Sequence, residues 1–268
     1  MSDTKNWWET GYAGAEREAE KGELGYGPTR FWLKPKAERQ LVFIDDSPFC
    51  FWEHQFKNER ERPDWVTCII KLHNECGGCG AKGVQKAEYV GHLTAIDITG
   101  YVDRNKVDHK YELIEFCPKT KVMNKLKSKK DRKGSLIGQL CTITRSDDHA
   151  PNTGDDLEFD REVKMEELYK LVTFRGKKIC DLIEAASGAG ADAARVRKFL
   201  CHNFQVPAEG EIPARIPLFN YAVLHAPLEP AALLQAVAGA QSYTSKFGDS
   251  GGQKPGGAGV RADEDIPF

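Results

Sequence analysis

A cluster of metal-binding side chains between positions 54 and 79 constrains this chain more than any other feature of its sequence. Five side chains that bind soft metal ions lie there: His54, Cys68, His73, Cys76 and Cys79. The last two form a Cys-x-x-Cys turn with two glycines between them, which brings both sulfur atoms to one point. Because a structural zinc ion needs four nitrogen or sulfur ligands in a tetrahedron, we expect this segment to fold around one ion.

We expect Cys76 and Cys79 to provide two of the four zinc ligands, and His54 and Cys68 to provide the others from a preceding hairpin. His73 is the alternative histidine, but a loop in which His73 and both later cysteines converge would be strained. A reduced turn that holds no ion is the competing interpretation, and the two additional ligands nearby favour the metal site over it. We expect the other cysteines, which are isolated in the sequence, to pack in the core as small apolar side chains. They are Cys50, Cys117, Cys141, Cys180 and Cys201.

No motif in the sequence predicts an enzyme. The glycines of Gly78-x-Gly80-x-x-Gly83 match a dinucleotide fingerprint, but no buried parallel strand leads into them and no amphipathic helix follows. His73-x-Glu75 before the Cys-x-x-Cys turn is similar to a zinc deaminase signature, in which the cysteine pair lies on a separate helix. We therefore expect a binding protein without catalytic residues.

Short segments rich in β-branched and aromatic residues predict a series of strands from Arg30 to Arg145. The predicted strands are 30–34, 40–44, 49–56, 65–72, 89–98, 110–117 and 136–145. A predicted helix over 120–130 interrupts them, and the combination fits an OB-fold barrel with an inserted zinc subdomain. Beyond Met165, apolar residues at helical intervals predict a smaller helical part, over 165–171, 179–186 and 193–204. The expected class is therefore mainly β within α+β.

The chain divides into four predicted parts. Residues 1–27 form a polar appendage with a helix-compatible run, and residues 28–165 form the barrel core, with the zinc subdomain at about 50–85. Residues 166–238 form the helical part. The glycine-rich composition of 239–268 predicts a flexible, disordered tail with an acidic tip.

Cysteine usage and hydropathy predict the compartment. Eight cysteines without a recognisable export signal favour reduced thiols over a disulfide framework. The longest apolar stretch, 231–240, is interrupted by Gln235 and is too short to cross a bilayer. We therefore expect a cytoplasmic protein with no membrane partner.

Opposite charges are segregated along the chain, although the formal net charge is only −2. Residues 119–133 contain eight basic side chains and one acid, whereas residues 146–167 contain nine acids and two bases. A cationic strip of this kind can bind a polyanion while the acidic segments keep other surfaces away from it. Two solvated surface segments are the alternative interpretation.

Aromatic and basic residues alternate on the same predicted strands, a pattern typical of proteins that bind single-stranded nucleic acid. Unpaired bases stack on exposed rings, while lysine and arginine contact the phosphates. Strand alternation predicts that Trp32 has an open face and that Trp52 lies on the same side as His54. The candidate DNA-binding residues are Arg30, Trp32, Lys34, Lys36, Trp52, Tyr89, Tyr101, Tyr111, Lys119, Lys121, Lys125, Lys127, Lys129 and Lys130.

The order of these features resembles the phage single-stranded DNA-binding proteins of the T4 helix-destabilising type. In that family a zinc subdomain is inserted in an OB-fold, and its ligands are a histidine, a cysteine after an aromatic-rich strand, and then a Cys-x-x-Cys turn. Glu53-His54-Gln55-Phe56, Trp65-Val66-Thr67-Cys68 and Cys76-Gly77-Gly78-Cys79 take those places here. The resemblance covers residues 28–165. The N-terminal segment departs from the family, whose arm is basic, because it is net acidic.

The chain ends in an acidic and apolar tip, Asp263-Glu264-Asp265-Ile266-Pro267-Phe268. This tip is similar to the C-terminus of bacterial single-stranded DNA-binding proteins, which recruits replication and repair proteins through its last residue. Together the two resemblances imply one structural zinc ion and a protein that coats single-stranded DNA in phage replication, recombination and repair, in the host cytoplasm. The alternative is a zinc-ribbon scaffold or a transcription or replication accessory factor that acts mainly through protein contacts.

Overall fold

The computed structural model describes residues 27–58, 63–102, 106, 108–238 and 240. This part of the chain is mainly β with several helices, so the predicted α+β class is confirmed. The predicted N-terminal appendage, except for Gly27, and the acidic tip lie outside the described residues. Among the described helices, none combines the length and hydropathy that a bilayer-spanning segment requires.

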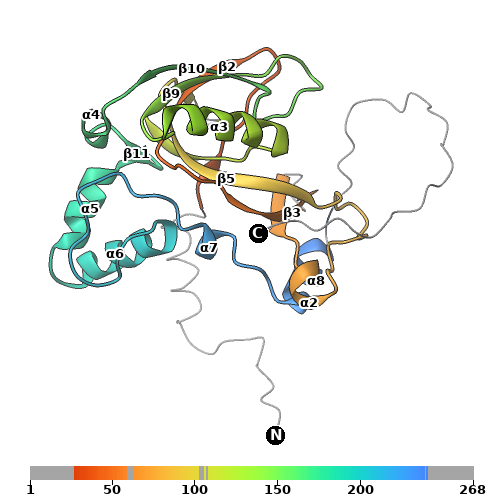
Figure 1. Cartoon of the computed structure of the whole chain (residues 1–268). Coiled ribbons are helices and arrows are strands. Elements are labelled where there is room, and N and C mark those ends of the chain that lie inside the picture. Colours follow the sequence, from red (N-terminus) through yellow and green to blue (C-terminus); the bar gives the residue numbers. More distant parts are fainter. Residues whose placement is uncertain (1–26, 59–62, 103–105, 107, 239, 241–268) are drawn as a thin grey trace, which may run out of the picture.

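One large mixed sheet forms the body of the protein (Figure 1). Its strands are β1 (Thr29–Arg30), β2 (Glu38–Phe43), β3 (Phe49–Lys57), β4 (Pro63–Thr67), β5 (Glu88–Asp97), β8 (Glu112–Phe116), β9 (Gln139–Thr144), β10 (Asp156–Glu162), β11 (Thr173–Phe174) and β12 (Lys177–Lys178). They are joined in the order β10-β9-β2-β5-β8-β11-β12; β1 lies parallel to β8, and β3 pairs with β4 and β5. A separate small hairpin pairs β6 (Tyr101–Val102) with β7 (Asp108–His109).

Strand β5 connects the two halves of this sheet. Its C-terminal half pairs with β8 on one edge and with β2 on the other, where Leu41 lies opposite Asp97. Its N-terminal half pairs with β3, where Trp52 lies opposite Tyr89. β2 and β3 therefore pair with successive parts of β5, and a short turn connects them. The β3–β4 hairpin extends the sheet next to the N-terminal half of β5.

The hydrogen-bonded order has two open ends, β10 and β12. Pairing among the described residues therefore does not close the sheet, and the predicted OB-fold barrel is not shown by it.

Several segments differ from the sequence prediction. The predicted strand 65–72 ends at Thr67 and is followed by the short helix α2 (Ile70–His73). The short strands β6, β7, β11 and β12 were not predicted. Strand β10 was not predicted either: it lies in an acidic segment, in which Leu157 and Phe159 alternate with acids and pack on the core. An edge strand with one solvated face contains few apolar residues, so its pattern is weak.

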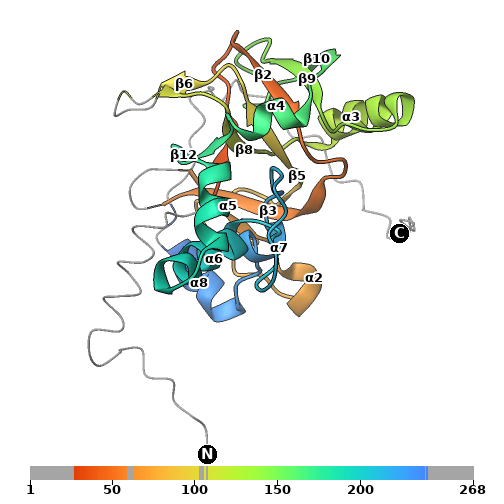
Figure 2. The same ribbon diagram turned by 90° about the vertical axis from the view of Figure 1, so that its left-hand side faces the viewer.

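Helices cover both faces of the sheet (Figures 1 and 2). They are α3 (Thr120–Lys133), α4 (Met165–Tyr169), α5 (Ile179–Ser187), α6 (Ala191–Asn203) and α7 (Tyr221–Leu224). Helix α8 (Pro230–Ala238) instead lies beside α2 and packs against Phe56 of β3. On β2, Val42 packs in one cluster with residues of the C-terminal helices, whereas Leu41 and Phe43 pack in another with Val122 and Leu126 of α3. Because alternate strand residues point to opposite faces, α3 covers one face and the C-terminal helices the other.

The centre of the C-terminal core is a group of stacked aromatic rings. Phe204 is fully buried, and its ring lies 4.9 Å from that of Phe174 and 5.3 Å from that of Phe219. We expect Phe204→Ala to lower the free energy of unfolding by about 3–5 kcal/mol, because it removes a buried ring and leaves a cavity. Denaturant unfolding measures this change. The control Leu171→Ala removes an exposed side chain, and we expect it to change stability by less than about 0.5 kcal/mol. Equal effects would contradict this description of the core.

Candidate metal centre and nucleic-acid interface

Four ligand side chains come together from the β3–β4 hairpin and the turn that follows α2. His54 lies on β3 opposite Val66 of β4, and Cys68 follows the end of β4, where its backbone amide donates to the carbonyl of Trp52. Helix α2 then returns the chain so that Cys76 and Cys79 face the hairpin, and the four residues form one cluster. His73, the alternative histidine, is exposed at the end of α2 and is not part of it.

The distances between these ligand atoms match the edges of a tetrahedral zinc site. Ligand bonds of about 2.3 Å to sulfur and 2.0–2.1 Å to nitrogen imply edges of about 3.8 Å between sulfurs and about 3.5 Å between sulfur and nitrogen. The Cys68 sulfur lies 3.9 Å from that of Cys76 and 3.7 Å from that of Cys79. His54 Nε2 lies 3.5 Å from both Cys76 Sγ and Cys79 Sγ. These four residues can therefore hold a metal ion without rearrangement.

The second nitrogen of His54 fixes the orientation of its ring. Nδ1 lies 2.9 Å from the carbonyl oxygen of Gln85, to which it can donate, and this leaves Nε2 free to bind a metal. Metal-binding histidines commonly donate their other ring N–H to a carbonyl or carboxylate in this way. His54 is fully buried, so the ring is also held by packing.

The two glycines of the Cys-x-x-Cys turn are required by close packing. A Cβ atom at Gly78 would lie 2.7 Å from the His54 ring, and one at Gly77 would lie 2.7 Å from the side chain of Leu234 on α8. Leu233 of the same helix is fully buried against the metal-binding segment. The turn is therefore enclosed between the histidine on one side and α8 on the other.

The three thiols differ in their pKa values without a metal. Burial alone would raise the pKa of Cys76, but hydrogen bonds from backbone amides and His54 outweigh it and lower that pKa to about 7. Burial and the neighbouring thiols raise the pKa of Cys79 to about 12. Burial also raises the pKa of Cys68. Metal ligation needs all three as thiolates, so uptake of the ion releases protons.

Gly78→Ala tests whether the turn must approach the histidine ring this closely. The added methyl group displaces His54, and we expect weaker zinc binding and a loss of about 1–3 kcal/mol in stability of the zinc-bound protein. Competition with a chromophoric chelator measures the affinity, and thermal unfolding measures the stability. The control is Gly188→Ala, where the nearest atom to a new Cβ is 3.4 Å away. Unchanged zinc affinity in the Gly78 variant would show that His54 is not a ligand.

The predicted DNA-binding aromatics do not lie on one surface. Trp52 and Tyr89 are opposite each other on β3 and β5, with ring centroids 5.6 Å apart, and are 39% and 41% exposed. Beside them, a cavity of 620 Å³ is lined by Trp52, His54 and two lysines, Lys71 and Lys86. We call this surface the metal-side face. Neither lysine has an ion-pair partner among the described residues, so the face has unpaired positive charge.

Trp32 lies on the opposite face of the hairpin. It is 49% exposed and lines a cavity of 660 Å³ together with Trp65, Arg30 and Lys119. The cations here already have partners: Lys119 Nζ lies 2.6 Å from a carboxylate oxygen of Glu88, and Arg30 pairs with buried acids. We call this surface the Trp32 face. Trp65, Lys71 and Lys86 are lining residues that the sequence analysis did not select; Trp65 could have been found from its strand alternation.

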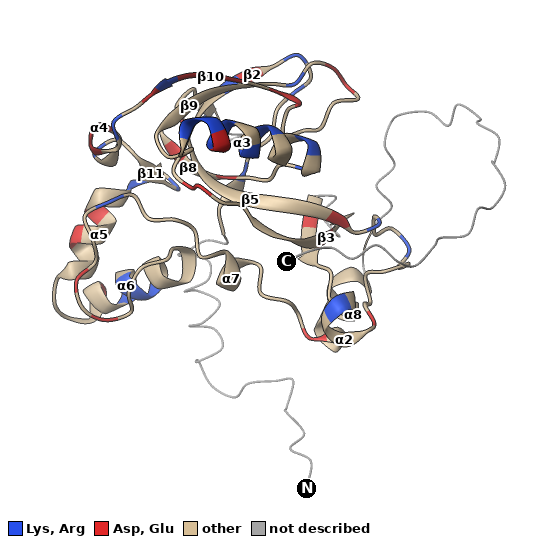
Figure 3. Ribbon diagram, viewed as in Figure 1, with Lys and Arg blue, Asp and Glu red and all other residues tan. Residues whose placement is uncertain are grey.

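Several lysines of the cationic strip are engaged within the protein. On α3, Lys125 and Lys127 pair with Asp156 and Asp131, and Lys130 donates to the carbonyl of Asp46. Lys129 lies over the ring of Phe159. The helix nevertheless presents a largely basic outer surface (Figure 3), on which Lys121 has no ion-pair partner among the described residues. Lys34 and Lys36 are exposed after β1.

The last two predicted aromatics lie elsewhere. Tyr101 is half-buried on the β6–β7 hairpin and stacks on His109, with centroids 4.7 Å apart. Tyr111 packs partly against the C-terminal core. Neither lines the cavity of the metal-side face or that of the Trp32 face.

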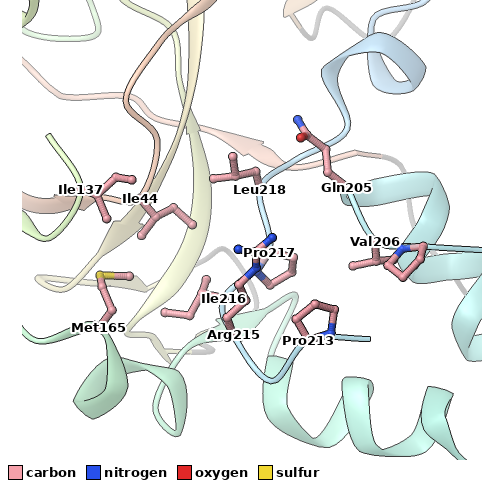
Figure 4. A pocket seen from close by; sticks show the side chains of 11 residues that line it. Ile44, Ile137, Met165, Gln205, Val206, Pro213, Arg215, Ile216, Pro217 and Leu218 are labelled. Atoms are coloured by element: carbon pink, nitrogen blue, oxygen red, sulfur yellow. The ribbon is translucent and has the colours of Figure 1, made fainter. Parts of the chain in front are cut away.

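A third cavity, of 330 Å³, lies between the sheet and the C-terminal part (Figure 4). Its lining is almost entirely apolar, with Ile44 and Ile137 on one side and Ile216 and Leu218 on the other. The one charged side chain is Arg215, and the lining has no thiol, imidazole, carboxylate or aromatic ring. This cavity therefore has neither metal-binding nor base-stacking chemistry.

Comparison with known proteins identifies no relative: no family model, curated protein or solved structure matches this chain. The candidate function therefore rests on the residues and their geometry.

Proposed function

We propose that this chain is a sequence-tolerant single-stranded DNA-binding protein without enzymatic activity, which uses one structural zinc ion to hold its binding surface. The observation that supports this most strongly is the metal-side face, where exposed rings of Trp52 and Tyr89 lie beside Lys71 and Lys86, two cations that no described acid pairs with. Rings of this kind stack on bases for about 1–3 kcal/mol each, and lysines neutralise phosphates. The Trp32 face offers rings too, but its cations are already paired.

Zinc is the ion that we propose for the Cys76, Cys79, Cys68 and His54 site. Three thiolates and one imidazole at tetrahedral spacing form a closed coordination shell, which is typical of structural zinc rather than of a catalytic ion with an open position. The ion would fix the β3–β4 hairpin against the turn after α2. Since Trp52 lies on that hairpin, the metal would hold one wall of the binding surface rigid.

The strand connections support an OB-like origin of the sheet. Strands β2, β5 and β8 form an antiparallel meander, α3 follows, and β9 returns to pair with β2. Strand β11 then lies parallel to β8. An OB-fold has this sequence of connections and is often only partly closed. We propose that the sheet is an opened variant of that fold, with the metal-binding segment inserted between its first two strands.

The two faces of the hairpin provide a matched pair of variants. We expect Trp52→Ala to weaken binding to an oligothymidine strand by about 5- to 150-fold, which corresponds to the loss of one stacked ring. Trp32→Ala removes an even more exposed tryptophan from the opposite face and should change affinity by less than about 2-fold under the same conditions. Fluorescence anisotropy of a labelled oligonucleotide measures both.

The reverse result, with Trp32 required and Trp52 dispensable, would place DNA on the other face and contradict our assignment. If the unsubstituted protein shows no preference for single strands, the scaffold or accessory-factor alternative replaces the proposed function. In that case the metal-binding segment would act through protein contacts.

We further propose that the tip, residues 263–268, recruits partner proteins and competes with DNA for the cationic surface. Its three acidic residues and terminal phenylalanine suit both roles. A chain truncated after position 262 should bind oligothymidine more tightly at low salt, and this gain should disappear as salt is raised because the competition is electrostatic. Anisotropy titrations at two salt concentrations check this. Equal affinity at low salt of the chains with and without residues 263–268 would exclude the competition.

A further inference from the structure

A second group of metal-binding side chains lies in the sheet, apart from the four ligands described above. His92 on β5, Glu115 on β8 and Cys117 just after β8 are all buried, and their ligand atoms lie within 4.8 Å of one another. The Cys117 sulfur is 3.6 Å from His92 Nδ1, close to the sulfur-to-nitrogen spacing at the first site. Cys117 is isolated in the sequence, and the pairing of β5 with β8 brings it beside His92 and Glu115.

A second histidine, from the C-terminal part of the chain, lies against this group. His225 follows α7, and its Nε2 lies 2.5 Å from the same oxygen of Glu115 that His92 Nδ1 approaches to 2.8 Å. The two imidazole rings are 4.6 Å apart. His92, Glu115 and Cys117 therefore bring together one nitrogen, one oxygen and one sulfur, and His225 Nε2 adjoins the same carboxylate. A donor set of this kind suits zinc or a similar transition metal.

With neutral imidazoles, this cluster has one more negative charge than positive charge. Apart from His92 and His225, Arg30 is the one basic side chain of the described residues that pairs there, and it contacts two buried carboxylates: Glu53, at 3.0 and 2.8 Å, and Glu115, at 3.2 Å. An uncompensated charge in a buried site is costly. A divalent ion bound with Cys117 as thiolate would give three positive and three negative charges, and the cluster would be neutral.

The orientation of His92 favours an ion at its Nδ1. Its other nitrogen, Nε2, is buried, has no hydrogen-bond partner in the described part of the chain, and lies 3.9 Å from Glu53 Oε2. If Nδ1 carried the proton, the lone pair of Nε2 would face that carboxylate. With a metal on Nδ1, the proton moves to Nε2 and points toward Glu53, which is the usual arrangement behind a metal-binding histidine.

We propose that His92, Glu115, Cys117 and His225 form a second transition-metal site, which fastens the C-terminal part of the chain to the sheet. The ion would join β5 and β8 to the segment after α7. In a tetrahedral site, a ligand nitrogen and a ligand oxygen lie about 3.3 Å apart. Binding of the ion would therefore move the Glu115 oxygen and the two imidazole nitrogens apart by about half an ångström or more. A hydroxyl of Thr67 already holds the backbone carbonyl of His225 at 2.9 Å, so the segment is in place to receive it.

Metal stoichiometry of the full-length chain tests this proposal. The protein is loaded with Zn²⁺, dialysed against metal-free buffer and analysed for zinc by mass spectrometry. We expect two ions per chain, and one ion in Cys117→Ser and in His225→Ala. His225 lies at the edge of the cluster, so this second variant keeps the test valid if the buried Cys117 variant does not fold.

Two controls separate this site from the first. Cys68→Ser should also retain one ion, now at the second site, whereas Cys141→Ser changes a buried cysteine away from both and should retain two. One ion in the unsubstituted chain, together with none in Cys68→Ser, would overturn the proposal. Neither result depends on DNA binding, so the proposed function stands or fails separately.

Discussion

Strand β5 hydrogen-bonds along its length to different neighbours, and the arrangement of the other elements depends on this shared pairing. One half is a central strand between β2 and β8, with buried residues on both faces. The other half supports β3, which in turn holds β4 and the metal-binding turn. The binding surface and the metal centre are therefore fixed to the core by a continuous strand rather than by a linker.

The metal-binding segment has too little apolar material to be stable alone. Its cluster of buried residues comprises only Phe56, Ile69, two of the cysteine ligands, and Leu233 and Val237 of α8. Small units of this kind usually need a metal or another cross-link. The C-terminal helix α8 therefore completes the core of a segment more than 150 positions before it in the sequence. The second cluster, with His225, would connect the same C-terminal region to the sheet at another point.

Local chemistry predicted much of this arrangement. Ligand spacing alone selected His54, Cys68, Cys76 and Cys79, because a Cys-x-x-Cys turn with glycines has few possible geometries, and the structure places all four together. Apolar periodicity located the central strands and α3. The strand β10 was missed because acids occupy its solvated positions. The division of Trp32 and Trp52 between two faces also could not be predicted, since it depends on how β1 packs beside the hairpin.

The distribution of charge over the folded protein also differs from its distribution along the sequence, because residues that are far apart in the sequence pair in the fold. The strip from Lys119 to Lys133 is the most basic segment of the sequence, yet several of its lysines are engaged within the protein: Lys125 with Asp156, Lys127 with Asp131 of the same helix, and Lys130 with the carbonyl of Asp46. Lys71 and Lys86 are separated in sequence and form no charge run, but both lie beside exposed rings and have no ion-pair partner within the described ranges of the chain. On α3, the pairing is determined by the fold: β10 pairs with β9, and α3 packs beside them, so that Lys125 reaches Asp156.

Titration of the intrinsic tryptophan fluorescence with oligothymidine, and with a duplex of equal length, tests the central claim most directly. Our account predicts strong quenching by the single strand, weakened by salt, and little response to the duplex, because only unpaired bases can stack on Trp52. No quenching, or equal quenching by both, would contradict it.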